Sequence, residues 1–294
     1  MSFGAEHESP RPPAGAGFSD AVTVAFADEA ADVYGLARLG LADGSASGLA
    51  LILHGGETVA ARAEAAGEAG GARWEQARAA GVSMGVAAPL ERWSVGFDGG
   101  AEDGFELELE ALGPPAELPA DSAVGAAGGM EGYEQLCRVR GTAQVDGRSM
   151  AIECLGQRGH QWGTPDWNRM DLARTVGVWL APDLAVVLSA VRPKDTKEHG
   201  GEAVTARVLE GSPATPLEIA EPRLSTTYDG ERRQRRAGFE LWPTEDAPVA
   251  RRGAGEVVCG TTLELGRLRL DAAFFRWRMD GREGLGRYDI LRRA

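Results

Sequence analysis

The sequence predicts an all-β protein with two antiparallel β domains, and two observations carry this prediction. First, glycine and proline contribute 41 and 15 of the 294 residues, and such turn formers disfavour long helices. Second, six Asp-Gly pairs, which favour the type I′ turn of a two-residue hairpin, begin at Asp43, Asp98, Asp103, Asp146, Asp229 and Asp280. We therefore expect antiparallel meanders. Residues 73–80 are the best helix candidate, and residues 61–71 are expected to form a loop.

Changes in composition divide the chain into four parts. Residues 1–17 contain three prolines and no apolar run, so we expect a flexible tail. A β domain is expected over residues 18–112 and a second one over residues 133–294. Between them, residues 113–132 are rich in proline and glycine, which predicts a linker. No repeat with a fixed period of about 20–50 residues is evident, and a weak duplication between the halves stays open.

The last Asp-Gly pair, at 280–281, predicts the register of a C-terminal hairpin. A two-residue turn there places Trp277 opposite Gly284 and Phe275 opposite Gly286. Large rings that cover glycines stabilise a strand, so we interpret these aromatic residues as structural.

Charge and cysteine content exclude several classes of function. The chain has 31 Lys and Arg against 44 Asp and Glu, a net charge of −13, which repels nucleic acid and anionic lipid, and we expect neither as a partner. Three cysteines, an odd number, do not form a disulfide framework, which favours a reducing cytoplasm. No signal peptide or membrane span is evident, and the histidines lack the spacing of metal ligands. We expect a cytoplasmic protein without a metal site.

The Asp-Gly pair at 146–147 locates a candidate site through the register of its hairpin. In a two-residue turn Val145 faces Arg148, and side chains two residues apart along each strand share a face. One face then carries apolar residues such as Cys137 and Ile152. We expect this face to line the interior.

At the open end of this hairpin, polar side chains join the apolar face. The register places Gln135 opposite Arg158 and Tyr133 opposite His160. An apolar interior with a few convergent polar groups is the usual form of a small-molecule site. The alternative interpretation is a plug, in which Tyr133 and His160 hydrogen-bond each other at the strand end.

The segment that follows the hairpin adds two indoles and a carboxylate. Residues 162–167 form a loop marked by glycine and proline, and this loop begins beside His160. We expect His160 and Asp166 to be catalytic. The expected substrate-binding residues are Tyr133, Gln135, Arg158, Trp162 and Trp167.

Several motifs resemble those of the carotenoid 1,2-hydratase (hydroxyneurosporene synthase) family, which is related to kievitone hydratase and to fungal lipocalin-like Diels-Alderases. The resemblance runs from about Phe18 to the end of the sequence. Its landmarks are residues 89–93, 133–135, 145–148, 156–163, 166–167 and 280–286. The His-x-Trp-Gly stretch at His160, with its trailing Asp-Trp, is the most specific of them.

The resemblance implies two lipocalin-like β-barrel or sandwich domains that enclose a site for a hydrophobic small molecule, with no metal or organic cofactor. It also implies hydration or cyclisation of isoprenoid or polyketide-like compounds. The family commonly has an acidic residue before the histidine and a serine after it, whereas this chain has Gly159 and Gln161.

Because of this departure, two functions stay open. The first is a cofactor-independent hydratase or cyclase, in which Asp166 or protonated His160 gives a proton to an alkene and water captures the cation. The faces of Trp162 and Trp167 would stabilise that cation. The second is a non-catalytic lipocalin-like protein that binds a hydrophobic ligand.

Overall fold

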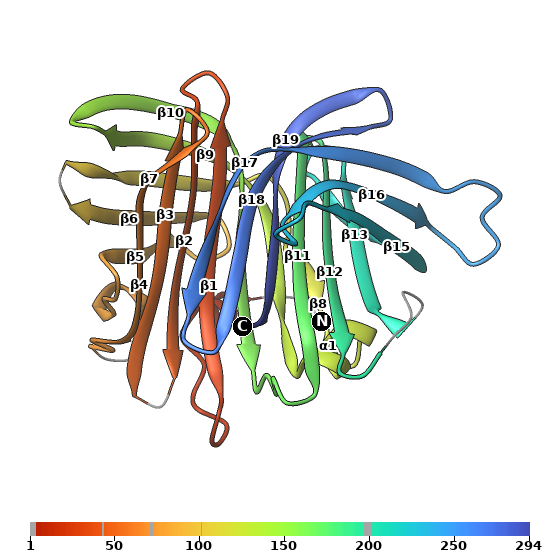
Figure 1. The fold of residues 1–294 in the computed structure, drawn as a ribbon, viewed down its shortest axis with the longest axis horizontal. Helices are drawn as coiled ribbons and strands as arrows, with labels where there is room; N and C mark the ends of the chain where they lie inside the picture. Colours follow the sequence, from red (N-terminus) through yellow and green to blue (C-terminus); the bar gives the residue numbers. More distant parts are fainter. Residues whose placement is uncertain (1–3, 43, 71–72, 101, 197–200) are drawn as a thin grey trace. The chain divides into compact units, whose positions relative to one another are not determined.

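The computed structural model describes residues 4–42, 44–70, 73–100, 102–196 and 201–294. The chain is nearly all β, as its turn residues predict, and forms two large antiparallel sheets (Figure 1). It divides into two compact units. The first unit contains residues 1–117 and 131–165, and the second contains residues 118–130 and 166–294. Within the described ranges, no helix is long and apolar enough to cross a membrane.

The sheet of the first unit has the strand order β4-β3-β2-β1-β10-β9-β7-β6-β5, and the short strand β8 pairs with β9. The strands span Ser19–Asp28 (β1), Val33–Ala42 (β2), Ser45–His54 (β3), Glu57–Gly67 (β4), Val82–Ala88 (β5), Arg92–Gly100 (β6), Asp103–Ala111 (β7), Ala116–Leu118 (β8), Met130–Val145 (β9) and Arg148–Gly163 (β10). Alternating residues turn one face of each strand into a common core. On β1, for example, Val22, Val24 and Phe26 are fully buried in this core.

The sheet of the second unit has the order β14-β13-β12-β11-β19-β18-β17-β16-β15. Its strands span Met170–Ala181 (β11), Leu184–Pro193 (β12), Ala203–Glu210 (β13), Thr215–Glu218 (β14), Glu221–Tyr228 (β15), Gln234–Trp242 (β16), Arg251–Leu265 (β17), Leu268–Met279 (β18) and Arg282–Arg293 (β19). Phe275 lies at the centre of a separate core, with its ring centroid 5.4 Å from that of Trp277 and 5.5 Å from that of Tyr288. Each unit therefore has its own hydrophobic core.

The two sheets share one connectivity. In each, a meander of four strands (β1–β4 or β11–β14) forms one side, and the last strand of the unit (β10 or β19) pairs with the first. The remaining strands form the other side of each sheet and follow the last strand in reverse chain order. They are β9, β7, β6 and β5 in the first sheet and β18, β17, β16 and β15 in the second. The duplication that the sequence leaves open is therefore present in the fold, although no sequence period reveals it.

Two of the expected Asp-Gly turns form as predicted. The pairs at 146–147 and 280–281 join β9 to β10 and β18 to β19, with φ angles of 50° and 72° in the first and 52° and 74° in the second. Positive φ at both positions defines the type I′ turn. In the second hairpin Trp277 faces Gly284, and Phe275 faces Gly286, which confirms the predicted register.

The other Asp-Gly pairs have different roles. The pair at 98–99 lies within β6, where it absorbs a β-bulge, and Asp103 begins β7. The pair at 229–230 lies in a longer loop between β15 and β16. Asp43 lies outside the described residues. At this bulge the positive φ of 72° belongs to Gly100, the residue after the pair, and not to Asp98 or Gly99.

The division into units differs from the expected boundary, which places residues 133–165 in the second domain. The hairpin of β9 and β10 instead completes the first sheet, because β10 pairs with β1 from Ser19 opposite Gly163 to Ala27 opposite Leu155. This pairing joins residues far apart in the sequence, and no local pattern indicates it.

The expected tail, linker and helix also differ in part from the structure. Within residues 1–17, the described part contains a 3-10 turn, η1 (Ala5–Glu8), and Glu8 is buried. The expected linker contains β8 and a short helix, α1 (Ala123–Gly128), because the Ser122 side chain caps its first turn. Residues 73–80 form only the 3-10 turn η2 (Trp74–Gln76), and β4 extends into the expected loop as far as Gly67. Residues 71–72 lie outside the described ranges.

Candidate functional site

A buried group of polar side chains lies at the open end of the β9–β10 hairpin in the first unit. Tyr133 and Gln135 project from β9, and Arg158 and His160 project from β10. All four are at most 1% exposed, although each carries polar atoms that are costly to bury without partners. The structure thus brings together four residues that the sequence indicates. We call these four, with Glu8 and Asp20, the interior polar cluster.

Glu8, a residue that sequence analysis assigns to a flexible tail, supplies the central carboxylate. Its Oε1 accepts hydrogen bonds from the Tyr133 hydroxyl and from Arg158 Nη1, the latter at 2.9 Å. Its Oε2 accepts from the indole N–H of Trp93, and its backbone carbonyl accepts from Trp74 Nε1 at 3.0 Å. These donors explain how a carboxylate with 2% exposure is accommodated.

The Arg158 guanidinium is held from several sides. Its Nη2 donates to Gln135 Oε1 at 2.5 Å, and its planar group lies 4.7 Å from the centroid of the Trp93 ring. The Gln135 amide is oriented in turn, because its Nε2 donates to the carbonyls of Leu90 and Gly113, both at 2.9 Å. The donors that face Glu8 are therefore fixed by the first unit itself.

His160 has an oxygen acceptor at each ring nitrogen. Nδ1 lies 2.9 Å from the backbone carbonyl of His7, and Nε2 lies 2.7 Å from Asp20 Oδ1. A carbonyl and a carboxylate both accept, so the imidazolium form, which donates from both nitrogens, satisfies both contacts. The pair with Asp20 is buried, at 0% and 1% side-chain exposure. The arrangement thus places both ring nitrogens of a buried histidine against oxygen acceptors.

Sequence analysis misses Asp20 for a physical reason. The β1–β10 register places Val22 opposite His160 and Asp20 opposite Trp162, which makes Asp20 and His160 diagonal neighbours on one face. The two residues are 140 positions apart in the chain. Only the closure of the sheet brings them together.

Aromatic rings surround His160. Its ring centroid lies 4.9 Å from that of Trp162, 5.5 Å from that of Trp74 and 5.8 Å from that of Tyr133. The Arg11 guanidinium lies over the Trp162 ring, 4.1 Å from its centroid. The Trp162 face therefore already binds a cation in this structure.

The protonation of the cluster follows from these contacts. Burial alone raises the pKa of the Glu8 carboxyl, but the Arg158 charge and the hydrogen bonds from Tyr133, Trp93 and Arg158 outweigh it and hold this pKa below its ordinary value. Burial raises the pKa of Tyr133, so its hydroxyl stays protonated and donates to Glu8. The cluster thus holds a carboxylate against a guanidinium.

Gly159 lies on the opposite face of β10, beside another carboxylate. A Cβ at Gly159 would approach Glu134 Oε2 to 2.4 Å. Glu134, on β9, accepts hydrogen bonds from Gln157 Nε2 at 2.7 Å and from Gln161 Nε2 at 2.9 Å. At the position where the resembling family has an acid, the neighbouring strand fills the space with its own carboxylate.

Asp166 and Trp167 lie at the start of the longer segment of the second unit, residues 166–294. Asp166 is exposed, and its Oδ1 accepts a hydrogen bond from the backbone N–H of Asn168 at 2.9 Å. Trp167 is half-buried and packs against an apolar cluster that includes Met170 and Val191. The expected catalytic role of Asp166 and the expected ligand contact of Trp167 stay predictions.

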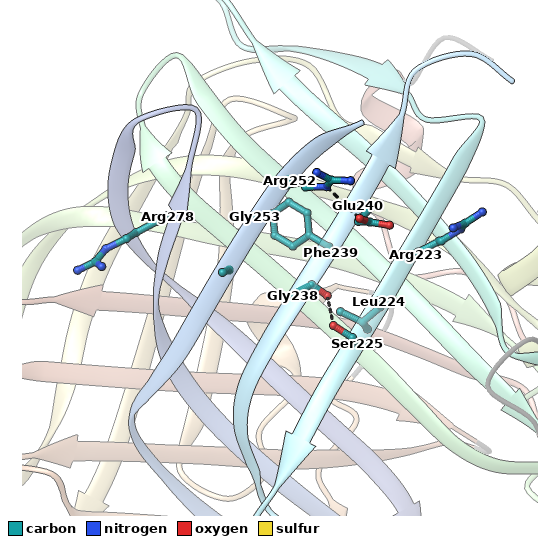
Figure 2. Close-up of a pocket in the computed structure, with 10 residues that line it drawn as sticks. Arg223, Leu224, Ser225, Gly238, Phe239, Glu240, Arg252, Gly253 and Arg278 are labelled. Carbon is teal, nitrogen blue, oxygen red and sulfur yellow. Dashed lines mark hydrogen bonds and ion pairs between the residues drawn. The ribbon is translucent and has the colours of Figure 1, made fainter. Parts of the chain in front are cut away.

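A groove of about 570 Å³ lies on strands β15, β16, β17 and β18 of the second unit, and Figure 2 shows its lining residues. Three exposed arginines contribute to it, but each has an acidic partner. Arg252 Nε donates to Glu240 Oε1 at 2.9 Å, Arg278 pairs with Glu283, and Arg223 pairs with Glu221. The groove has no uncompensated charge, so we take the interior polar cluster as the candidate site.

Metal-binding and thiol groups are scarce in the described ranges. No group of three His, Cys, Asp or Glu side chains there is placed to hold a metal ion. Cys137 and Cys154 are free thiols, and burial raises their pKa values to about 11 and about 12. Such thiols stay protonated at neutral pH, which makes them poor nucleophiles and poor ligands.

Residues 4–294 match the model of a family described as a domain of unknown function, DUF7064, and the chain belongs to this family. No curated protein sequence matches the chain significantly. The likeness to carotenoid 1,2-hydratases is therefore not a family assignment.

Solved structures show the same fold at low sequence identity. A protein from Nitrosomonas europaea described as an AttH has a TM-score of 0.67 at 8% identity, with 95% of this chain and 93% of that chain covered. Kievitone hydratase from Nectria haematococca has a TM-score of 0.64 at 10% identity, with 94% and 89% covered. CghA, also solved with Sch210972, has a TM-score of 0.65 at 11% identity, with 95% and 89% covered. The lipocalin-like fold is thereby confirmed.

Proposed function

We propose that the chain binds a hydrophobic small molecule of the isoprenoid or polyketide-like class in its first unit. It converts this molecule by acid catalysis, as a hydratase or cyclase that needs no metal or organic cofactor. The observation that carries the proposal is the environment of His160, whose two ring nitrogens both face acceptors among buried aromatic rings. An imidazole that donates from Nδ1 can act as the general acid toward an alkene held against it.

The reaction follows from this geometry. A ligand that replaces the His7 carbonyl meets Nδ1–H of His160, and the alkene π pair takes this proton to form a C–H bond. The neighbouring carbon becomes a cation, which the face of Trp162 stabilises as it now stabilises a guanidinium. Water then attacks the cation and returns a proton to Nδ1. Alternatively, a second alkene attacks the cation and closes a ring, and the new ring cation loses a proton from a neighbouring carbon to Nδ1. Asp20 keeps Nε2 protonated throughout, so the imidazole left behind is a defined tautomer.

The remaining cluster residues bind the polar end of the ligand. Tyr133 and Arg158 donate hydrogen bonds, and Gln135 holds Arg158 in place. Asp166 is outside the proposal as proton donor, because its carboxylate is exposed and accepts a hydrogen bond from the backbone N–H of Asn168.

The test is turnover of linear isoprenoids and polyene polyketides, followed by mass spectrometry. Hydration adds the mass of one water, and cyclisation changes the retention time at constant mass. In D₂O the product gains carbon-bound deuterium. We expect His160→Gln to lose turnover and Asp20→Asn to lower it by about 100-fold or more.

Arg140→Gln is the matched control, because Arg140 is an exposed cation of the same sheet, paired with Glu153. Its turnover should equal that of the unsubstituted chain. Undiminished turnover in a folded His160→Gln protein would exclude His160 as the acid.

A non-catalytic binding protein is the second candidate, and one observation favours it. Position 159, where the resembling family carries an acid, is a glycine, and the Glu134 carboxylate lies where its Cβ would be. In this case the ligand is recovered chemically unchanged after long incubation, and His160→Gln weakens binding only.

A further inference from the structure

Residues 7–11 occupy the interior polar cluster through three chemically different contacts. The backbone carbonyl of His7 meets Nδ1 of the imidazole, the carboxylate of Glu8 meets the hydrogen-bond donors, and the guanidinium of Arg11 covers Trp162. In the proposed reaction the alkene takes the place of the His7 carbonyl, and the polar end of the substrate takes the place of the Glu8 carboxylate. The substrate cation takes the place of the Arg11 guanidinium. The segment therefore fills each part of the site with a group of matching chemistry.

Little else fixes this segment. Glu8 is its one buried residue among residues 4–17, and the residues from Pro12 to Gly17 are exposed. Besides the contacts above, the Trp74 indole N–H donates to the Glu8 carbonyl at 3.0 Å, and the Arg11 backbone N–H donates to Asp20 Oδ2 at 2.6 Å. A segment held by so few groups can leave as a unit if its anion is replaced.

The hydrogen-bond donors that face the Glu8 carboxylate, in contrast, lie on strands of the first unit. Tyr133 and Arg158 lie within paired strands, and Trp93 lies on β6. Arg158 is 1% exposed, and a guanidinium buried without an anion is strongly destabilising. Whatever displaces Glu8 must therefore bring a negative charge to the same place, which a neutral hydrocarbon or alcohol does not do.

We propose that the place held by the Glu8 carboxylate is the binding site for an anionic oxygen group of the ligand, a carboxylate or an acidic enol. The ligand enters by displacing residues 7–11. This inference rests on the proposed function in so far as it locates the ligand in the same cluster. It adds that the chain carries its own competitor for the site.

Acetate tests the anion site directly. Glu8→Ala removes the side-chain atoms beyond Cβ, which are those of one acetate ion. We expect acetate to raise the melting temperature of Glu8→Ala by about 3 °C or more and to leave the unsubstituted chain unchanged. Acetamide, a neutral molecule of the same shape, and sodium chloride at equal ionic strength are the controls. No effect of acetate, or an equal effect of acetamide, overturns the anion site.

Displacement is tested in the unsubstituted chain, so that a folding defect of Glu8→Ala does not matter. Hydrogen exchange of residues 4–18 is measured with retinoic acid and with retinol, an isoprenoid carboxylate and its alcohol. We expect at least tenfold faster exchange with retinoic acid and no change with retinol. Equal acceleration by both would make the segment a steric cover, and no acceleration would make Glu8 a permanent ion-pair partner; either result overturns the inference.

These measurements do not require turnover. Acetate rescue and segment release without conversion of any substrate would contradict the catalytic proposal and leave this inference standing. Turnover without acetate rescue or segment release would support the catalytic proposal and overturn this inference.

Discussion

Single residues decide the chemistry of the candidate site, and Glu8 shows how. A glutamate in a proline-rich segment is ordinarily a solvated charge, yet here three side-chain donors and one indole to its backbone carbonyl surround it. His160 is comparable, since it lies on the inward face of β10 and its Nε2 lies 2.7 Å from Asp20 Oδ1. Both residues are buried because their partners are already in place.

The pH dependence of stability follows from the lowered pKa of Glu8. The unfolded chain binds this proton more readily than the native chain, so Glu8 contributes stability above its ordinary value of about 4.3, and this stability is lost as the pH falls below it. We expect Glu8→Gln to lower the free energy of unfolding by about 3–5 kcal/mol at neutral pH, because it leaves Arg158 without an anion.

Urea unfolding between neutral pH and about pH 3 checks this expectation. The difference between the unsubstituted chain and Glu8→Gln should be constant at neutral pH and shrink below about pH 4.3. Glu153→Gln removes an exposed carboxylate and serves as the control. A difference independent of pH would mean that the Glu8 carboxyl has the same pKa in the native and the unfolded chain.

At the scale of elements, the hairpins set which side chains face inward. The turn at 146–147 places Ile152 in the core, with 2% exposure, and leaves Glu153 exposed, as the predicted faces require. The C-terminal hairpin places rings over glycines in the predicted register. In both hairpins a type I′ turn determines the pairing of every residue that follows.

Gly286 on β19 provides a prediction at this scale. A Cβ there would approach the carbonyl oxygen of Gly177 to 2.0 Å and Trp277 Cδ1 to 3.0 Å. We expect Gly286→Ala to lower the free energy of unfolding by about 1–3 kcal/mol or more, because backbone must move to admit the methyl group.

Gly230 is the matched control, since a Cβ there has nothing within 4 Å. Gly230→Ala should change the free energy of unfolding by less than about 0.5 kcal/mol in chemical denaturation. Equal effects of the two substitutions would contradict the packing described for β19.

At the scale of the whole molecule, the chain contains the same connectivity twice. Each copy closes when its last strand pairs with its first, and each has a separate core. Residues 4–17 and the interior polar cluster belong to the first copy. The second copy buries a different polar pair, Arg174 with Glu202, so the two copies do not carry the same polar groups.

The membership of β9 and β10 in the first unit is testable by hydrogen exchange. Ile152→Ala removes apolar contacts from the first core and should cost about 2–5 kcal/mol. We expect faster exchange in β1–β3 and unchanged exchange in β12 and β13. Ile290→Ala, in the second core, should show the opposite pattern. Faster exchange of β12 and β13 in Ile152→Ala would instead support a boundary at residues 113–132.

The sequence by itself determines the all-β class, the two type I′ hairpins and the inward face that carries Tyr133, Gln135, Arg158 and His160. These features depend on neighbours within a few residues, namely turn dipeptides and a period of two, and so they can be read locally. The lipocalin-like fold is predicted separately, by the resemblance of short motifs to those of a known family.

Only the tertiary structure decides the unit boundary and the partners of the site. Glu8 meets Tyr133 and Arg158 across 125 and 150 positions of the chain, and Asp20 meets His160 across 140. Such contacts exist only after β10 has paired with β1, and nothing in the composition of residues 1–17 indicates them. The physical reason is that burial of a charge depends on where its counter-charges end up, which is a property of the closed sheet and not of the local sequence.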